Sequence, residues 1–134
     1  MLVDDHDIVR ESWKLLLDKD DRFSVIAQFN NGAEAIKQAG NLLPDIILMD
    51  INMSPINGFE ATQKIMEILP SARIIGISVN TNQSYVTKML AFGAKGFVTK
   101  TSPLDELKMA ILKVHNGENY ICEEIKKGYP GKEE

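Results

Sequence analysis

The chain has 134 residues, which is enough for one domain of ordinary size and too few for two. Hydrophobic residues make up 44% of the chain and charged residues 25%, which is the balance of a soluble globular protein. The net charge of −4 argues against a nucleic-acid-binding surface, the single cysteine excludes an internal disulfide, and no apolar run is long enough to span a bilayer. We therefore expect a cytoplasmic protein with no membrane contact.

Short apolar runs alternate along the chain with amphipathic helical segments. The predicted strands are Met1–Val3, Phe23–Phe29, Ile46–Met49, Arg73–Ser78 and Gly96–Thr99. The predicted helices are Asp7–Lys19, Gly32–Ala39, Phe59–Leu69, Gln83–Phe92 and Pro103–Val114. Five strand–helix units in succession predict a parallel sheet with right-handed crossovers. At this length we expect a flavodoxin-like, doubly wound three-layer α/β sandwich, with five helices and a five-stranded sheet of order 2-1-3-4-5.

The two ends of the chain depart from this regular pattern. Only three residues precede Asp4, so the first strand is short although it is central in the predicted sheet. The last segment contains scattered apolar residues, several charges, Gly128, Pro130 and Gly131. We therefore predict a domain over residues 1–121 and a tail over 122–134, or the start of a linker to an output domain, with a short helical turn near 123–127 and Cys122 as an ordinary thiol.

Polar side chains follow four of the predicted strands at the point where each strand ends. Asp4 and Asp5 follow the first strand, Asp50 follows the third, Ser78 ends the fourth, and Lys100 follows the fifth. In an open α/β sheet, ligands bind beyond the carboxyl ends of the strands. Each residue alone could be a turn, a helix cap or a solvated charge, but one site at this edge explains all of them together.

Three carboxylates held close together repel one another and resist full ionisation. A hard divalent cation with oxygen ligands relieves this repulsion, and a site with few carboxylates and open coordination positions suits Mg²⁺. A carboxylate nucleophile beside Mg²⁺, a lysine and a hydroxyl is a constellation typical of phosphoryl transfer. His6 lies beside these acids in the sequence, and for it we expect a capping or solvent-exposed role.

Several sequence runs together resemble the response regulator receiver family over about residues 1–121. The runs are Leu2-Val3-Asp4-Asp5-His6, Pro44-Asp45-Ile46-Ile47-Leu48-Met49-Asp50-Ile51-Asn52-Met53, Asn57-Gly58, Ile77-Ser78 and Gly93-Ala94-Lys95-Gly96-Phe97-Val98-Thr99-Lys100. The first and last of these, with Asn116-Gly117 and Tyr120-Ile121, look most like the NarL/FixJ (LuxR-type) branch. In that branch a helix-turn-helix DNA-binding domain usually follows the receiver.

The resemblance implies a role for each residue that matches a family motif. Asp50 would be the phosphoacceptor. Asp5, Asp50 and the backbone carbonyl of Asn52 would be the Mg²⁺ ligands, and Asp4 would hold the metal through water.

The resemblance also implies how the phosphoryl group would be bound and sensed. Ser78 and Lys100 would bind it, and Phe97 matches the aromatic switch position. Asn52 and Asn80 lie where they could tune the lifetime of the aspartyl phosphate. The expected partners are a sensor histidine kinase and a second copy of the chain after phosphorylation, with DNA bound only through a further C-terminal domain.

Three other functions stay open at this point. The chain could be a stand-alone receiver that acts in a phosphorelay or docks to a protein target, or a receiver-like domain that is never phosphorylated. It could also be a phosphatase of the haloacid-dehalogenase type, although those enzymes need a second acid where this chain has Asn52. No glycine-rich phosphate loop occurs, which argues against a nucleotide-binding module. We expect no turnover of an external substrate.

Overall fold

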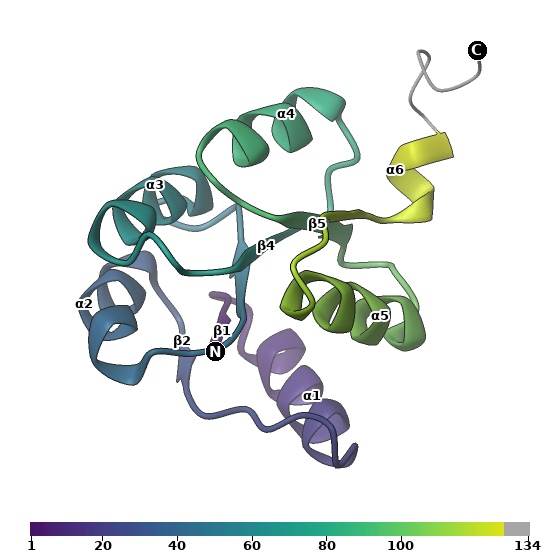
Figure 1. Cartoon of the computed structure of the whole chain (residues 1–134), viewed down its shortest axis with the longest axis horizontal. Helices are drawn as coiled ribbons and strands as arrows, with labels where there is room; N and C mark the ends of the chain where they lie inside the picture. Colours follow the sequence, from purple (N-terminus) through teal and green to yellow (C-terminus); the bar gives the residue numbers. More distant parts are fainter. Residues whose placement is uncertain (128–134) are drawn as a thin grey trace.

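A parallel sheet runs through the centre of residues 1–127, the part of the chain that this computed structural model describes (Figure 1). Its order is β2-β1-β3-β4-β5-β6. The strands are β1 (Leu2–Val3), β2 (Gln28–Phe29), β3 (Ile47–Asp50), β4 (Ile74–Ser78), β5 (Gly96–Thr99) and β6 (Tyr120–Ile121). The helices are α1 (Asp7–Asp18), α2 (Gly32–Leu42), α3 (Gly58–Ile68), α4 (Gln83–Ala91), α5 (Leu104–His115) and α6 (Glu123–Lys127).

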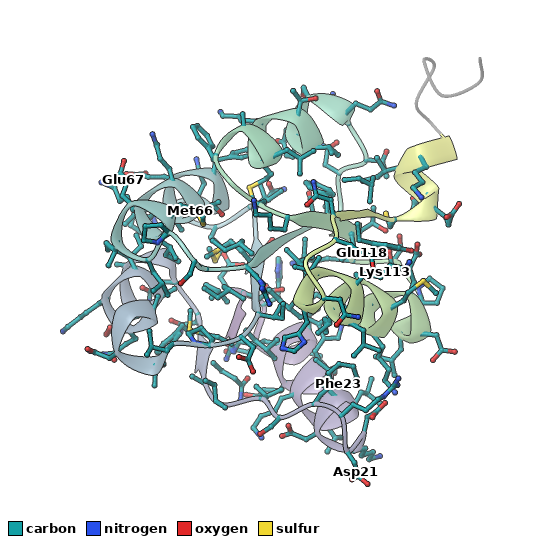
Figure 2. All side chains as sticks on the ribbon, in the orientation of Figure 1. Asp21, Phe23, Met66, Glu67, Lys113 and Glu118 are labelled. Carbon is teal, nitrogen blue, oxygen red and sulfur yellow. The ribbon has the colours of Figure 1, made fainter. Side chains whose placement is uncertain are left out.

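Helices cover both faces of the sheet. Figure 1 shows α2, α3 and α4 on one face and α1 and α5 on the other. Every residue of β3, β4 and β5 is buried, and side chains fill the space between the layers (Figure 2). The predicted flavodoxin-like, doubly wound α/β sandwich is confirmed. Within residues 1–127, no helix combines the length and apolar character needed to cross a membrane.

The predicted number of five strands and five helices is wrong, because a sixth strand and a sixth helix follow α5. Strand β6 pairs in parallel with β5, and the backbone N–H of Cys122 donates to the carbonyl of Phe97 at 3.0 Å. Tyr120, Cys122 and Ile125 are buried against the sheet. The apolar run from Tyr120 to Cys122 is short, and Glu123 and Glu124 follow it, so the sequence pattern resembles a tail rather than an edge strand followed by a packed helix.

The helical turn expected near 123–127 is present as α6, whereas Cys122 is a core residue rather than a thiol in a tail. Packed side chains therefore continue beyond residue 121. The division of the chain at that residue stays a prediction, and the expected linker over 128–134 lies outside the described residues.

Strand β2 is also shorter than predicted. Only Gln28 and Phe29 pair with β1, because β1 itself offers just Leu2 and Val3 for pairing. Before Gln28, the carbonyl of Ala27 still accepts from the N–H of Leu2 at 3.0 Å, whereas the backbone N–H of Val25 donates to the Asp18 carboxylate at 2.8 Å. The other elements agree with the predicted ranges to within a few residues.

Gly58 lets α3 begin directly against the segment that carries Asp50. Its N–H donates to the carbonyl of Ile51 at 2.8 Å, while the Asn57 side chain accepts from the Glu60 N–H and caps the helix. A Cβ at position 58 would collide with the backbone of Asp50 and Ile51. Backbone atoms cannot yield as a flexible side chain could, so this approach requires glycine.

We expect Gly58→Ala to lower the free energy of unfolding by roughly 2 kcal/mol or more, since the loop after β3 must shift to admit the methyl group. Gly40→Ala is the matched control, because its Cβ would meet only a side-chain atom of Ile68, at 3.8 Å. Gly40 is exposed near the end of α2, where alanine is the better helix former. The change should therefore stabilise the fold by up to about 1 kcal/mol. Urea denaturation measures both values, and equal effects would contradict the packing described for Gly58.

Candidate functional site

Three carboxylates meet at the carboxyl ends of the central strands. Asp4 and Asp5 follow β1, and Asp50 is the last residue of β3, the neighbour of β1 in the sheet. Each offers an oxygen atom that lies within 4.8 Å of the others, and the His6 ring joins the same group. We call Asp4, Asp5 and Asp50 the acidic cluster. The structure thus brings together the acids that the sequence placed on separate strands.

Lys100 is the cation that faces the acidic cluster. It follows β5, and its backbone N–H donates to the carbonyl of Ser78 at 2.9 Å. Its Nζ lies 3.1 Å from Asp4 Oδ2 and 3.4 Å from Asp50 Oδ2, and its side chain is only 10% exposed. In this state the lysine is closer to Asp4 than to the predicted phosphoacceptor.

Two oxygens of the acidic cluster have no hydrogen-bond donor. Asp4 Oδ2 and Asp50 Oδ2 are both buried. Lys100 Nζ lies at ion-pair distance from each, but within the described residues neither oxygen accepts a hydrogen bond. Buried carboxylate oxygens are costly when they lack donors. A divalent cation with oxygen ligands would satisfy them, so the residues present fit Mg²⁺.

The pKa of Asp50 reflects the crowding of these acids. Burial raises the pKa to about 7, and the neighbouring Asp4 carboxylate adds to the shift. Lys100 and the backbone N–H of Asn52, which donates to Asp50 Oδ1 at 3.2 Å, act in the opposite direction. The pKa of Asp50 thus stays raised despite Lys100, mainly because the carboxyl group is buried.

Arg10 holds the loop of Asp4 in place, and the sequence analysis missed it. The Arg10 side chain is almost entirely buried, and its Nη1 donates to the backbone carbonyl of Asp4 at 2.6 Å. Its Nε donates to the side chain of Gln28 on β2, and its Nη2 pairs with Asp7. The sequence does offer a signal for this role, because Arg10 lies one turn into the helix that follows Asp4 and Asp5.

Ser78 ends β4 at the same edge of the sheet. The residue before it, Ile77, pairs with Asp50 in the sheet register, and Ser78 itself pairs with Thr99. The Ser78 hydroxyl is buried and accepts from the backbone N–H of Asn80 at 2.9 Å. The side chain of Asn80 in turn accepts from the N–H of residue 82, so both groups shape the loop into α4.

Phe97 lies inside the domain rather than at its surface. It is fully buried on β5, and its ring packs beside Gly76 together with Met89 of α4. The four residues from Phe97 to Lys100 therefore connect a core contact near α4 to the lysine of the site.

This gathering of acids and a lysine at one edge of a doubly wound sheet matches the class of receiver domains that the sequence resembles. The response regulator receiver domain family matches residues 1–112 of the chain. The response regulator GacA of Pseudomonas viridiflava is 37% identical over 125 residues, which cover 93% of this chain and 58% of that protein. The transcriptional regulatory protein DegU of Brevibacillus brevis is 36% identical over 121 residues, 90% of this chain and 51% of that protein.

Solved structures agree with these relatives. A two-component response regulator of the LuxR family from Aurantimonas sp. SI85-9A1 superposes with a TM-score of 0.91 at 33% identity, covering 95% of this chain and 91% of that one. The receiver domain of NarL from Mycobacterium tuberculosis gives 0.83 at 27% identity, covering 87% and 94%. The chain therefore belongs to the response regulator receiver domain family, and the resemblance to its NarL/FixJ branch is confirmed. The chain spans little more than half the length of the curated relatives that it matches.

The charge crowding at Asp50 has a measurable consequence for stability. Because its folded pKa of about 7 lies above that of an unfolded aspartate, the folded state holds more protons between these two values. The free energy of unfolding then falls as the pH rises through this interval. Asp50→Asn removes the charge, so in chelator at about pH 8 we expect it to be more stable than the wild type by on the order of 1 kcal/mol.

Urea denaturation across the pH range tests this expectation. The advantage of Asp50→Asn should shrink toward about pH 4, where Asp50 is protonated in the folded state and roughly half protonated in the unfolded chain. Asp45→Asn is the control, because Asp45 is exposed at the opposite end of the same strand. A less stable Asp50→Asn protein at the higher pH would show that charge repulsion does not govern the site.

Proposed function

We propose that this chain accepts a phosphoryl group on Asp50 from a sensor histidine kinase, with Mg²⁺, and then changes conformation to control an output. The observation that carries the proposal is the state of Asp50 Oδ2. This oxygen is buried, has no hydrogen-bond donor and lies within 3.4 Å of Lys100 Nζ.

The acidic cluster supports the metal requirement. Asp5, Asp50 and the backbone carbonyl of Asn52 would hold Mg²⁺, and Asp4 would hold it through water. When bound, the ion polarises the phosphoryl oxygens and neutralises part of the carboxylate charge.

The residues of the chain account for the transfer itself. Asp50 Oδ2 has a free lone pair, attacks phosphorus and forms the new P–O bond. The P–N bond of the donor phosphohistidine breaks, and the imidazole leaves with the electron pair. Lys100 moves from Asp4 to a phosphoryl oxygen, where its charge stabilises the transition state. A dehalogenase-type phosphatase also attacks with an aspartate but needs a second acid for proton transfer, and Asn52 cannot supply one. We therefore expect no turnover of an external substrate.

The hydrogen bonds around Ser78 support a conformational response. Its hydroxyl is buried and bound only to the loop N–H of Asn80 in the described residues. A phosphoryl oxygen on Asp50 is a stronger acceptor for that hydroxyl, so the loop after β4 would be drawn toward the site. Because Phe97 packs against Met89 of α4, a shift of this loop would release the ring to change rotamer.

A second set of contacts leads from the site toward the C-terminus. Thr99, the neighbour of Lys100, donates its hydroxyl to the Glu124 carboxylate at 2.8 Å, and Thr101 donates to the same oxygen at 3.1 Å. Glu124 lies on α6. Movement of Lys100 would therefore reach α6 and any domain that follows it, which supports an output such as a DNA-binding helix-turn-helix domain. A second copy of the chain is the further partner that we propose for the phosphorylated state.

Mass spectrometry after incubation with acetyl phosphate and Mg²⁺ tests the phosphoacceptor. We expect one phosphoryl adduct on the wild type and on Asp45→Ala, and none on Asp50→Ala. Omission of Mg²⁺ should remove the adduct as well. An undiminished adduct on Asp50→Ala would overturn the assignment.

Lys100→Met tests the role of the lysine. Because the variant keeps every acid of the cluster, we expect Mg²⁺ still to bind while the rate of phosphorylation falls roughly 100-fold. Lys95→Met is the matched control, since Lys95 is exposed at the opposite end of β5. The initial rate with acetyl phosphate measures the effect, and an unchanged rate would contradict transition-state stabilisation by Lys100.

A further inference from the structure

The His6 ring lies among the acids rather than on the outer surface of α1. Its Nδ1 is 3.1 Å from Asp4 Oδ1, 3.3 Å from Asp5 Oδ1 and 4.0 Å from Asp50 Oδ2. The ring is 60% exposed, so solvent or an ion can reach the nitrogen. The sequence predicted a capping or solvent-exposed role: the ring is exposed to solvent, and its Nδ1 also faces the acids.

Helix capping does not account for this position. His6 occupies the N-cap of α1, but its side chain makes no capping hydrogen bond. Its backbone N–H donates to Asp4 Oδ1 at 2.8 Å, and its ring Nδ1 lies 3.1 Å from the same oxygen, which is outside the helix. The ring is therefore free of any role in the helix end.

His6 Nδ1 is surrounded by the polar groups of the site. Lys100 Nζ lies 2.9 Å from it, and Asp4 Oδ1 lies 3.1 Å from it on the side of the acidic cluster. Imidazole nitrogen is a common ligand of metal ions, so its place among these oxygens is that of a further donor atom for a bound ion.

The distances also match the spacing of ligands around one ion. With bonds of about 2.1 Å, neighbouring ligands of an octahedral ion are about 3 Å apart and opposite ones about 4.2 Å apart. The separation of Nδ1 from Asp5 Oδ1, 3.3 Å, is close to that of neighbouring ligands. Independently, the buried Asp4 Oδ2 and Asp50 Oδ2 accept no hydrogen bond from the described residues, which fits a cluster that binds a cation.

We propose that His6 Nδ1 is a direct ligand of the ion held by the acidic cluster, and that it gives the site a preference for divalent transition-metal ions over Mg²⁺. The proposal rests on the divalent site of the proposed function. Mg²⁺ favours oxygen ligands, whereas imidazole nitrogen strengthens binding of first-row transition metals. An ion on Nδ1 also displaces Lys100 from His6 and leaves the lysine available to Asp50.

Mn²⁺ is the probe, because its unpaired electrons report a directly bound nitrogen. Electron spin-echo envelope modulation of the Mn²⁺ complex, prepared from protein without a histidine tag, should show coupling to ¹⁴N of imidazole. We expect the coupling in the wild type and in His115→Phe, and its loss in His6→Phe. His115 is the matched control, since it is the other of the two histidines and ends α5.

Binding constants provide the second readout. We expect His6→Phe to weaken Mn²⁺ binding roughly tenfold and Mg²⁺ binding much less. Bound Mn²⁺ without nitrogen coupling in the wild type would overturn the proposal, as would an equal loss of affinity for both ions in His6→Phe. Failure of the wild type to bind either ion, or undiminished binding by Asp5→Asn and Asp50→Asn, would instead refute the divalent site of the proposed function.

Discussion

The structure of this site depends on the repulsion between carboxylates buried at the edge of a sheet. Asp4 and Asp50 are each only 1% exposed, and one lysine faces them both. The fold tolerates this arrangement because Lys100 lies at ion-pair distance, yet it leaves one oxygen of each acid without a donor. The unfavourable electrostatics thus favour a cation beside the acids, and they leave Asp50 Oδ2 without a hydrogen bond from the described residues.

The surrounding fold keeps this unfavourable arrangement rigid. Strand β1 is just two residues long, so backbone pairing alone gives Asp4 little support. The buried guanidinium of Arg10 supplies this support by donating to the backbone carbonyl of Asp4. Gly58 packs closely against the backbone of Asp50 and so holds the second acid in place. Both contacts act on main-chain atoms, so they position the acids without neutralising them.

Much of this arrangement could be predicted from the sequence, because parallel strands bring their carboxyl ends to one edge. Because Asp50 and Lys100 each follow an apolar run, the sequence predicts that both lie at this edge of the sheet. Arg10 could not be found in this way, because its contact is with a backbone carbonyl and leaves no complementary residue type to recognise. Strand β6 was missed for a related reason: Tyr120 and Cys122 are buried through pairing with β5, whereas the charged residues around them are typical of a tail.

The last two strands give the site a physical link to the end of the domain. Lys100 directly follows β5, Phe97 on the same strand packs against α4, and Thr99 binds Glu124 of α6. A strand of four residues is too short to bend independently at each of these points, so a displacement at its carboxyl end is shared by all three. Since β6 pairs with β5 and Ile125 is buried beside it, α6 must follow the strand. Contacts along β5, β6 and α6 therefore connect the residue next to Lys100 with Glu124 of α6.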